Sequence, residues 1–278
     1  MPFKKSTVSV IIILVGLATI VVMSGLNFLI PQDTRIDADE NPEAEQARYG
    51  AGTDERGYEN MEKIYLITKD NIKIVANLYG VNNPAGWVIL VHMMPATKES
   101  WTELANDFQN AGYESIAFDL RGHGESDGGP EGYLNFSDSQ HQKSILDLEA
   151  AADYLIKEWG ATPDKISFVG ASISANLSLQ YISENQQFKT AVLLSPGLNY
   201  RGIKTEPLVK NLKAGQKVFF ISSRDDGEDA EENQKLYQSV PAGIEKEIKI
   251  YEDAGHGTMI LENKSELKNL ILEFLRVK

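Results

Sequence analysis

Three residues, in the chain order Ser, Asp, His, could together turn a hydroxyl group into a nucleophile. Ser172 lies in the pentapeptide Gly170–Ser174, between an apolar run and a helix-like segment, while Asp226 and His256 each follow an apolar, strand-like run. A serine hydroxyl is a poor nucleophile at neutral pH, so an imidazole must accept its proton and a carboxylate must orient the imidazole. We expect Ser172 to be the nucleophile, His256 the general base, and Asp226 or its neighbour Asp225 the orienting acid.

Ser172 is predicted to lie on a sharp strand-to-helix turn. Such a turn strains the backbone and lifts the hydroxyl clear of the sheet, where N–H groups at the start of the helix can meet an oxyanion. The turn requires small neighbours, and Gly170 and Ala171 meet that requirement. Ser174 stands where the pattern G-x-S-x-G has its second glycine, so the match to the pattern is imperfect.

Alternating strand and helix patterns surround these residues and predict a doubly wound, mostly parallel α/β sheet preceded by a β-hairpin. The hairpin is expected at 64–68 and 72–78, and the later strands at 87–91, 115–119, 166–169, 191–194, 218–221 and 247–251. Helices are expected at 100–110, 139–159, 175–182, 230–238 and 264–276. Because ligand sites of open α/β sheets form at the carboxyl ends of the strands, Ser172, Asp226 and His256 are expected to meet there.

From about Glu62 to its C-terminus the chain resembles the α/β-hydrolase superfamily. The strand and histidine of Trp87–His92 resemble the family's oxyanion loop, and Phe118–Ser126 matches the loop pattern D-x-R-G-x-G-x-S. The nucleophile pentapeptide and the Ser, Asp, His order agree with the same family. The resemblance implies an α/β-hydrolase fold.

The resemblance also implies roles for particular residues. The backbone N–H groups of Ile173 and Met94 are expected to form the oxyanion hole, with Met93 as the alternative to Met94. Asp226 matches the family's acid position, five residues beyond the end of its strand, and Asp225 is the alternative acid.

The chain departs from the family pattern at His92–Pro95, where relatives usually have His-Gly. Met93 could line an acyl pocket or pack in the core, and the sequence leaves both interpretations open. His92 and His123 are interpreted as residues that structure their loops. His141, beside a predicted helix start, is interpreted as solvent-exposed.

Composition narrows the possible classes of partner and chemistry. The chain has 278 residues, a formal net charge of −13 and no cysteine. The negative charge argues against nucleic acid as the main partner, because nucleic acid requires a basic surface. The absence of cysteine excludes a thiol nucleophile and thiolate metal sites. We predict no cofactor and no metal site.

The N-terminal sixty residues differ from the rest of the chain. Lys4 and Lys5 precede an uncharged stretch over 6–32 that is long enough to cross a bilayer, since about 20 apolar residues are needed. We predict a transmembrane signal anchor over 1–31, with a cleaved signal peptide as the alternative, and an acidic flexible linker over 32–60. Flanking charge predicts a cytoplasmic N-terminus and an extracytoplasmic catalytic domain over 61–278.

The combined expectation is a membrane-anchored serine hydrolase that cleaves small-molecule carboxylic esters through an acyl-enzyme. The short segment from Pro196 to Gln216 leaves no room for a large cap domain. In this respect the chain resembles the small carboxylesterases and the dienelactone-hydrolase-like branch, with serine in place of that branch's cysteine. The segments 127–136 and 198–208 are expected to border the pocket. A serine peptidase, a thioesterase and a catalytically silent binding module remain as alternatives.

Overall fold

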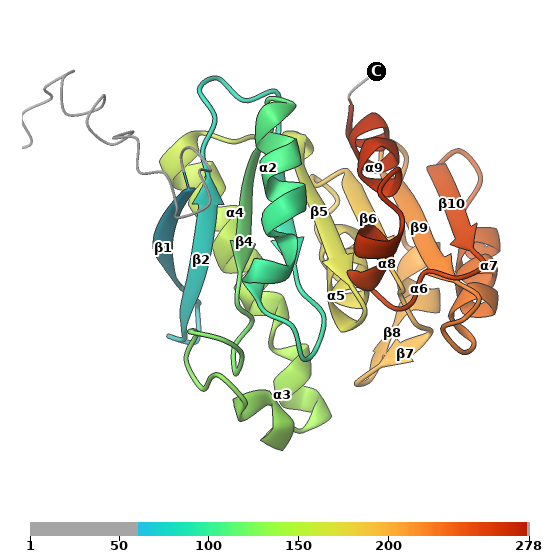
Figure 1. Cartoon of the computed structure of the whole chain (residues 1–278), viewed down its shortest axis with the longest axis horizontal. Helices are drawn as coiled ribbons and strands as arrows, with labels where there is room; N and C mark the ends of the chain where they lie inside the picture. The colour runs from blue at the N-terminus through green and yellow to red at the C-terminus, as the bar shows by residue number, and fades with distance from the viewer. Residues whose placement is uncertain (1–60, 277–278) are drawn as a thin grey trace, which may run out of the picture. The chain divides into compact units, whose positions relative to one another are not determined.

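The computed structural model describes residues 61–276, and its main feature is one eight-stranded sheet in the order β1-β2-β4-β3-β5-β6-β9-β10 (Figure 1). Its strands are β1 (Met61–Ile67), β2 (Lys73–Tyr79), β3 (Trp87–Val91), β4 (Glu114–Phe118), β5 (Ile166–Ala171), β6 (Thr190–Leu194), β9 (Lys217–Ser223) and β10 (Glu245–Tyr251). β1 pairs antiparallel with β2, β2 pairs antiparallel with β4, and the remaining pairs are parallel. The predicted fold class, a doubly wound sheet with an N-terminal hairpin, is confirmed.

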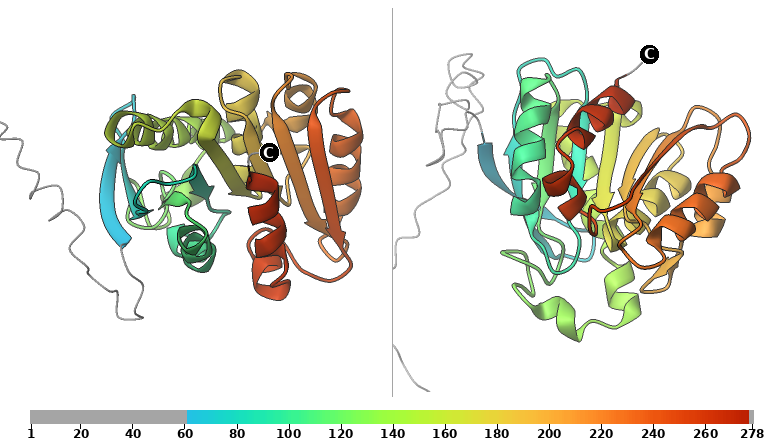
Figure 2. Two further views of the ribbon diagram at one scale, coloured as in Figure 1. Left: turned by 90° about the horizontal axis from the view of Figure 1, so that it is seen from above. Right: turned by 45° about the vertical axis from the view of Figure 1, so that its right-hand side comes forward.

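Helices cover both faces of the sheet, as the view from above shows (Figure 2). One face carries α2 (Thr102–Asn110), α8 (Met259–Asn263) and α9 (Leu267–Leu275). The other carries α4 (Ile145–Trp159), α5 (Ile173–Glu184), α6 (Thr205–Lys210) and α7 (Asp229–Ser239). Short elements complete the described chain: η1 (Lys98–Trp101), η2 (Gly132–Asn135), η3 (Pro163–Lys165), α3 (Asp138–Gln142), β7 (Asn199–Tyr200) and β8 (Ile203–Lys204).

The central strands are apolar on both sides because helices bury both faces of the sheet. Neighbouring residues of one strand therefore enter different cores. Phe168 and Phe220 belong to the core on the α5 side, whereas Val169 and Phe219 belong to the core that includes α9. These strands consequently read in the sequence as continuous apolar runs, which is why their positions were predictable.

The predicted helix over 139–159 is wrong at its start, because α3 and α4 are separate helices. α3 ends at Gln142 with Lys143 as its C-cap, and Ser144 is the N-cap of α4. His141 is also not solvent-exposed as predicted: it is 3% exposed and contacts the Phe136 ring edge-on at 5.4 Å. Burial lowers the pKa of His141.

The segment between β6 and β9 holds only the β7–β8 hairpin and α6, so the prediction that no large cap domain fits there is confirmed. The predicted anchor over 1–31 and linker over 32–60 lie outside the described residues. No helix within 61–276 combines the length and the apolar character that a membrane span needs.

Candidate active site

Ser172 lies on the turn between β5 and α5 and has a strained backbone, with φ 57° and ψ −125°. Such angles are rare for a residue with a side chain, and they persist only where surrounding structure enforces them. The Ser172 N–H donates a 2.8 Å hydrogen bond to the carbonyl oxygen of Leu194 at the end of β6. A Cβ at Gly170 would collide with the Ser174 carbonyl oxygen, which explains why the turn requires glycine there. The expected strained elbow is present.

Ile173 is the first residue of α5, a helix of 12 residues. The first N–H groups of an α-helix have no acceptor within the helix, and the helix dipole makes this end partly positive. Within the turn, the N–H groups of Ala175 and Asn176 donate to the Ser172 carbonyl oxygen. The Ile173 N–H therefore stands at the end of the helix that favours negative charge, beside the serine.

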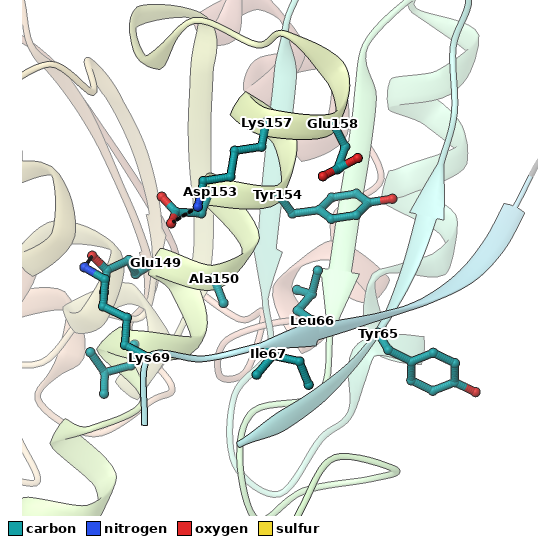
Figure 3. A pocket seen from close by; sticks show the side chains of 11 residues that line it. Tyr65, Leu66, Ile67, Lys69, Glu149, Ala150, Asp153, Tyr154, Lys157 and Glu158 are labelled. Atoms are coloured by element: carbon teal, nitrogen blue, oxygen red, sulfur yellow. Dashed lines mark hydrogen bonds and ion pairs between the residues drawn. The ribbon is translucent and has the colours of Figure 1, made fainter. Parts of the chain in front are cut away.

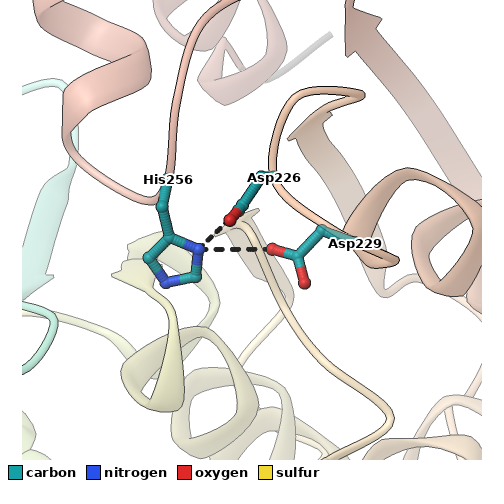
Figure 4. A group of neighbouring side chains, drawn as sticks. All are labelled: Asp226, Asp229 and His256. Atoms are coloured by element: carbon teal, nitrogen blue, oxygen red, sulfur yellow. Dashed lines mark hydrogen bonds and ion pairs between the residues drawn. The ribbon is translucent and has the colours of Figure 1, made fainter.

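His256, in the loop after β10, is oriented by a carboxylate from the loop after β9. Its Nδ1 lies 2.5 Å from Asp226 Oδ2, and Figure 4 shows Nε2 on the opposite side of the ring from this contact. An imidazole that donates from Nδ1 keeps Nε2 free to accept a proton. Burial tends to lower the pKa of His256, but Asp229 and Asp226 outweigh it and the pKa is raised.

Asp225, the alternative acid, has different partners. Its side chain accepts hydrogen bonds from the Ser223 hydroxyl and from the N–H groups of Ala254 and Gly255, the latter two at 3.1 and 3.2 Å. These hydrogen bonds, led by the one from Ser223, lower the pKa of Asp225 to about 2. Asp226 thus lies on the imidazole, whereas Asp225 holds the backbone just before His256.

A third carboxylate, Asp229, was not predicted from the sequence. It is the first residue of α7, and its Oδ2 lies 3.3 Å from His256 Nδ1 (Figure 4). Burial raises the pKa of Asp229 to about 6, and the neighbouring Asp226 adds to the effect. The run from Asp225 to Asp229 contains four acidic residues, so only the path of the loop decides which of them reach the histidine.

Gly257 packs the loop that carries His256 against the loop after β3 and against the end of β5. Its φ is 57°, and a Cβ built on it would lie 3.5 Å from Ala171 Cβ and 2.5 Å from Met93 Sδ. Its N–H donates a 3.0 Å hydrogen bond to the Ser195 hydroxyl. Gly257, which follows His256, therefore packs against Ala171, which precedes Ser172. The structure thus brings the loops that carry Ser172 and His256 together.

The loop that follows β3 is tied to the elbow through its backbone. The Ser174 hydroxyl donates a 2.6 Å hydrogen bond to the His92 carbonyl oxygen, and the Leu120 N–H donates to His92 Nε2 at 3.0 Å. Met93 and Met94 are both half-buried, and Met94 packs against the core on the α5 side while Met93 packs against the core that includes α9. The loop expected to supply an oxyanion donor thus lies directly over the start of α5.

His92 and His123 structure their loops, as predicted. His92 is fully buried, and His123 stacks on the Tyr133 ring with centroids 4.1 Å apart and 9° between the planes. Burial lowers the pKa of His123 to about 4, and His92 adds to this effect. A neutral, buried His123 fits a packing role between the loop after β4 and η2.

Within residues 61–276, one group of side chains has ligand atoms close enough together to hold a metal ion. It consists of Asp226, Asp229 and His256, whose ligand atoms all lie within 4.8 Å of one another. Two ligands of a tetrahedral zinc ion would lie roughly 3.4 Å apart, because each stands about 2.1 Å from the metal. The 2.5 Å separation of His256 Nδ1 from Asp226 Oδ2 is shorter and fits a hydrogen bond. The arrangement is that of an oriented imidazole.

The described residues also line cavities away from Ser172. One of about 190 Å³ lies between β1 and α4, beside the ion pairs Lys69–Glu149 and Lys157–Asp153 (Figure 3). A second, of about 310 Å³, includes Asp127, Gly128 and Phe136, and a third, of about 480 Å³, includes Leu198 and Lys204. The last two use residues of the segments 127–136 and 198–208.

Comparison with known proteins identifies the family. Residues 82–220, half of the chain, match the family described as serine aminopeptidase, S33. The chain belongs to this family of α/β-hydrolases. The match contains Ser172 and ends before Asp226 and His256, so the assignment of those two residues depends on the geometry of this α/β-hydrolase.

Several individual proteins are similar to this α/β-hydrolase over part of its length. A polyketide transferase from Penicillium crustosum is 26% identical over 142 residues, 49% of this chain and 44% of that protein. A thiohydrolase from Aspergillus aculeatus is 28% identical over 147 residues, 50% of this chain and 43% of that protein. The alignments thus span less than half the length of these curated relatives.

Solved structures share the fold at low sequence identity. An esterase from Pyrococcus furiosus superposes with a TM-score of 0.65 and 22% identity, over 78% of this chain and 91% of that one. A dienelactone hydrolase from Anabaena variabilis superposes with a TM-score of 0.62 and 17% identity, over 77% and 95%. At these identities the likeness establishes the α/β-hydrolase fold.

Proposed function

We propose that this protein is a serine hydrolase that cleaves carboxylic esters through an acyl-enzyme on Ser172. The observation that carries the proposal is the 2.5 Å contact of His256 Nδ1 with Asp226 Oδ2, in a loop packed against the Ser172 elbow. A carboxylate in this position selects the tautomer whose Nε2 accepts a proton and stabilises the imidazolium that forms. A strained serine beside a helix N-terminus supplies the other half of the chemistry.

The proposed reaction has two halves. His256 Nε2 takes the Ser172 proton while Oγ attacks the substrate carbonyl, and the N–H groups of Ile173 and Met94 stabilise the oxyanion. His256 then gives the proton to the departing alcohol, leaving an acyl group on Ser172. Water attacks this acyl group with its proton passing to His256, and the acid departs as Ser172 recovers its proton.

Esters are the first choice of substrate, and thioesters and peptides are the alternatives. The thiohydrolase among the relatives and the esterases among the structural neighbours support acyl transfer to water, and the family description adds aminopeptidase activity. All three substrates pass through the same tetrahedral oxyanion, so the triad alone does not choose between them. The short segment between β6 and β9 favours small substrates that need no large cap.

We further propose that an N-terminal anchor over 1–31 holds the catalytic domain on the extracytoplasmic side of a membrane. The uncharged stretch over 6–32 and the preceding Lys4 and Lys5 support this orientation. The test is extraction of the full-length chain from membranes. Recovery only with detergent is expected, and release by salt or alkaline washing would contradict the anchor.

The decisive experiment is covalent labelling of the full-length chain by a fluorophosphonate probe, with Ser172→Ala and His256→Ala beside the parent. The probe reports an activated serine without knowledge of the substrate. Labelling of the parent that disappears in both variants is expected. A folded parent that resists labelling would contradict the proposal and favour the catalytically silent binding module. A labelled parent is then screened with p-nitrophenyl esters, acyl thioesters and aminoacyl amides.

A further inference from the structure

Asp229 is a buried carboxylate that faces the imidazole of His256 without being the acid expected from the family. The residue is 8% exposed, and its Oδ2 lies 3.3 Å from His256 Nδ1, next to the shorter contact from Asp226. A buried aspartate needs partners, because leaving a carboxylate unpaired in the interior is costly. The partners of Asp229 therefore indicate what it does.

Tyr200 in β7 is the partner on the other side of the carboxylate. Its hydroxyl donates a 3.2 Å hydrogen bond to Asp229 Oδ1, so the two oxygens of Asp229 face Tyr200 and His256. The Tyr200 ring lies against Gly197, where a Cβ would be 2.6 Å from the ring. Gly197 is itself fixed, since its N–H donates to Asn176 Oδ1 and its carbonyl oxygen accepts from the Thr205 hydroxyl. The tyrosine is thus presented to Asp229 by a rigid support.

The backbone of Asp229 is held as firmly as its side chain. Its N–H donates to the Asp226 carbonyl oxygen at 3.1 Å, which links the two acidic residues through one short loop. The Asn233 side-chain amide donates both to the Asp229 carbonyl oxygen and to that of Pro196, at 2.8 and 3.0 Å. These bonds join the start of α7 to the segment after β6, so the carboxylate has little freedom to leave the histidine.

We propose that Asp229 is a positioning residue for His256, a second carboxylate beside Nδ1 that is held in place by the Tyr200 hydroxyl. The inference depends on the proposed function, in which His256 is the general base. The imidazole then has one hydrogen-bond acceptor, Asp226, and one further carboxylate within ion-pair distance, Asp229. When Nε2 takes the Ser172 proton, the resulting positive charge faces two carboxylates, and Nδ1 keeps its own proton throughout.

Two consequences distinguish this role from a purely structural one. A second negative charge near the ring favours the protonated form of His256, so removing it lowers the pKa of the histidine. Asp229 also offers a substitute acceptor when Asp226 is lost. Replacing Asp226 alone should therefore harm the reaction less than replacing both.

The first test measures the pKa of His256 by NMR titration of histidine-labelled full-length protein, with His256→Ala used to assign its signal among the four histidines. Asp229→Asn is expected to lower this pKa by about one unit, the effect of losing a charge within a few ångströms. Tyr200→Phe, which keeps all charges, is expected to lower it less. Glu228→Gln is the matched control, because it removes an exposed charge one residue away. Unchanged values in Asp229→Asn and Tyr200→Phe would overturn the proposal.

The second test follows labelling rate and ester hydrolysis in Asp226→Asn, Asp229→Asn and the double variant. The double variant is expected to be at least about tenfold slower than Asp226→Asn, and equal rates would overturn the proposal. Because the titration does not require turnover, it separates the two hypotheses. If the parent is not labelled but Asp229→Asn still lowers the His256 pKa, Asp229 is a partner of His256 and the hydrolase function is rejected. A parent that is labelled, with a His256 pKa that does not change in Asp229→Asn, would support the hydrolase and reject Asp229 as a partner of His256.

Discussion

The Ser174 hydroxyl donates a 2.6 Å hydrogen bond to the main-chain carbonyl oxygen of His92. The bond joins the first turn of α5 to the loop after β3, which are the two segments expected to supply the oxyanion donors. The position that carries glycine in the usual elbow pattern is thus used here to hold the oxyanion loop. This loop lacks the glycine after His92 that the family usually has, and the serine supplies a different means of holding it.

Ser174→Ala is expected to lower the free energy of unfolding by about 1–2 kcal/mol, because a buried hydrogen bond is lost. It should also slow the labelling of Ser172 severalfold, since the loop with Met94 loses its link to α5. The measurements are denaturant unfolding and probe labelling. Ser178→Ala is the matched control: Ser178 is buried on the same helix, and its hydroxyl has no hydrogen-bond partner among the described residues. Equal effects of the two substitutions would contradict this assignment.

Replacing Asp225 and Asp226 by asparagine is expected to change different properties, stability for Asp225 and activity for Asp226. Asp226→Asn should lower kcat/KM by about 10²-fold or more with little loss of stability, because it removes the acceptor that fixes the His256 tautomer. Asp225→Asn should instead lower the melting temperature, because it weakens the bonds to Ala254 and Gly255. A larger loss of kcat/KM in Asp225→Asn would reverse the assignment.

The stability effect of Asp225 should depend on pH in a defined direction. Its folded-state pKa of about 2 lies below the ordinary value of 3.8, so its contribution is present above pH 4 and is lost as the pH falls toward 2. The melting temperatures of the parent and of Asp225→Asn should therefore differ at pH 7 and converge at low pH. Thermal unfolding across this range checks the sign. A constant difference would show that the ionised carboxylate is not the source of the effect.

The sequence predicted the sheet well because its strands are continuous apolar runs and lie at intervals that helices fill. The places of Ser172 and His256 in the fold were predictable for a related reason, because each follows the carboxyl end of a strand that reads as an apolar run. Asp229 was not, because no spacing rule separates it from its acidic neighbours. Its role depends on the first turn of α7 and on Tyr200, which lies in a two-residue strand that carries no apolar pattern. The burial of His141 was not predicted either, because it depends on a contact with Phe136 that the local sequence pattern does not indicate.

Activity should fall at acidic pH with a midpoint above the ordinary histidine value of 6.5. His256 acts as a base only when neutral, and the two carboxylates raise its pKa despite burial, so the active form is lost as the pH falls through this raised value. The pH profile of kcat/KM for an ester substrate measures the midpoint. Asp226→Asn should move it downward, because one of the charges that stabilise the imidazolium is gone. A midpoint below 6.5 in the parent would contradict the arrangement.

Gly170→Ala is expected to damage the elbow. The added methyl group would collide with the Ser174 carbonyl oxygen and lie close to the Ser178 hydroxyl, both in the first turns of α5. Overpacking of this kind typically costs about 1–3 kcal/mol, and here the strain would be relieved by moving the helix start away from β5. Because Ser172 and the Ile173 N–H move with that start, probe labelling should fall together with stability. Gly132→Ala is the control, since its methyl group would meet backbone atoms no nearer than 3.5 Å, an ordinary contact. Normal labelling in a destabilised Gly170→Ala variant would show that the position of the helix start does not limit the activation of Ser172.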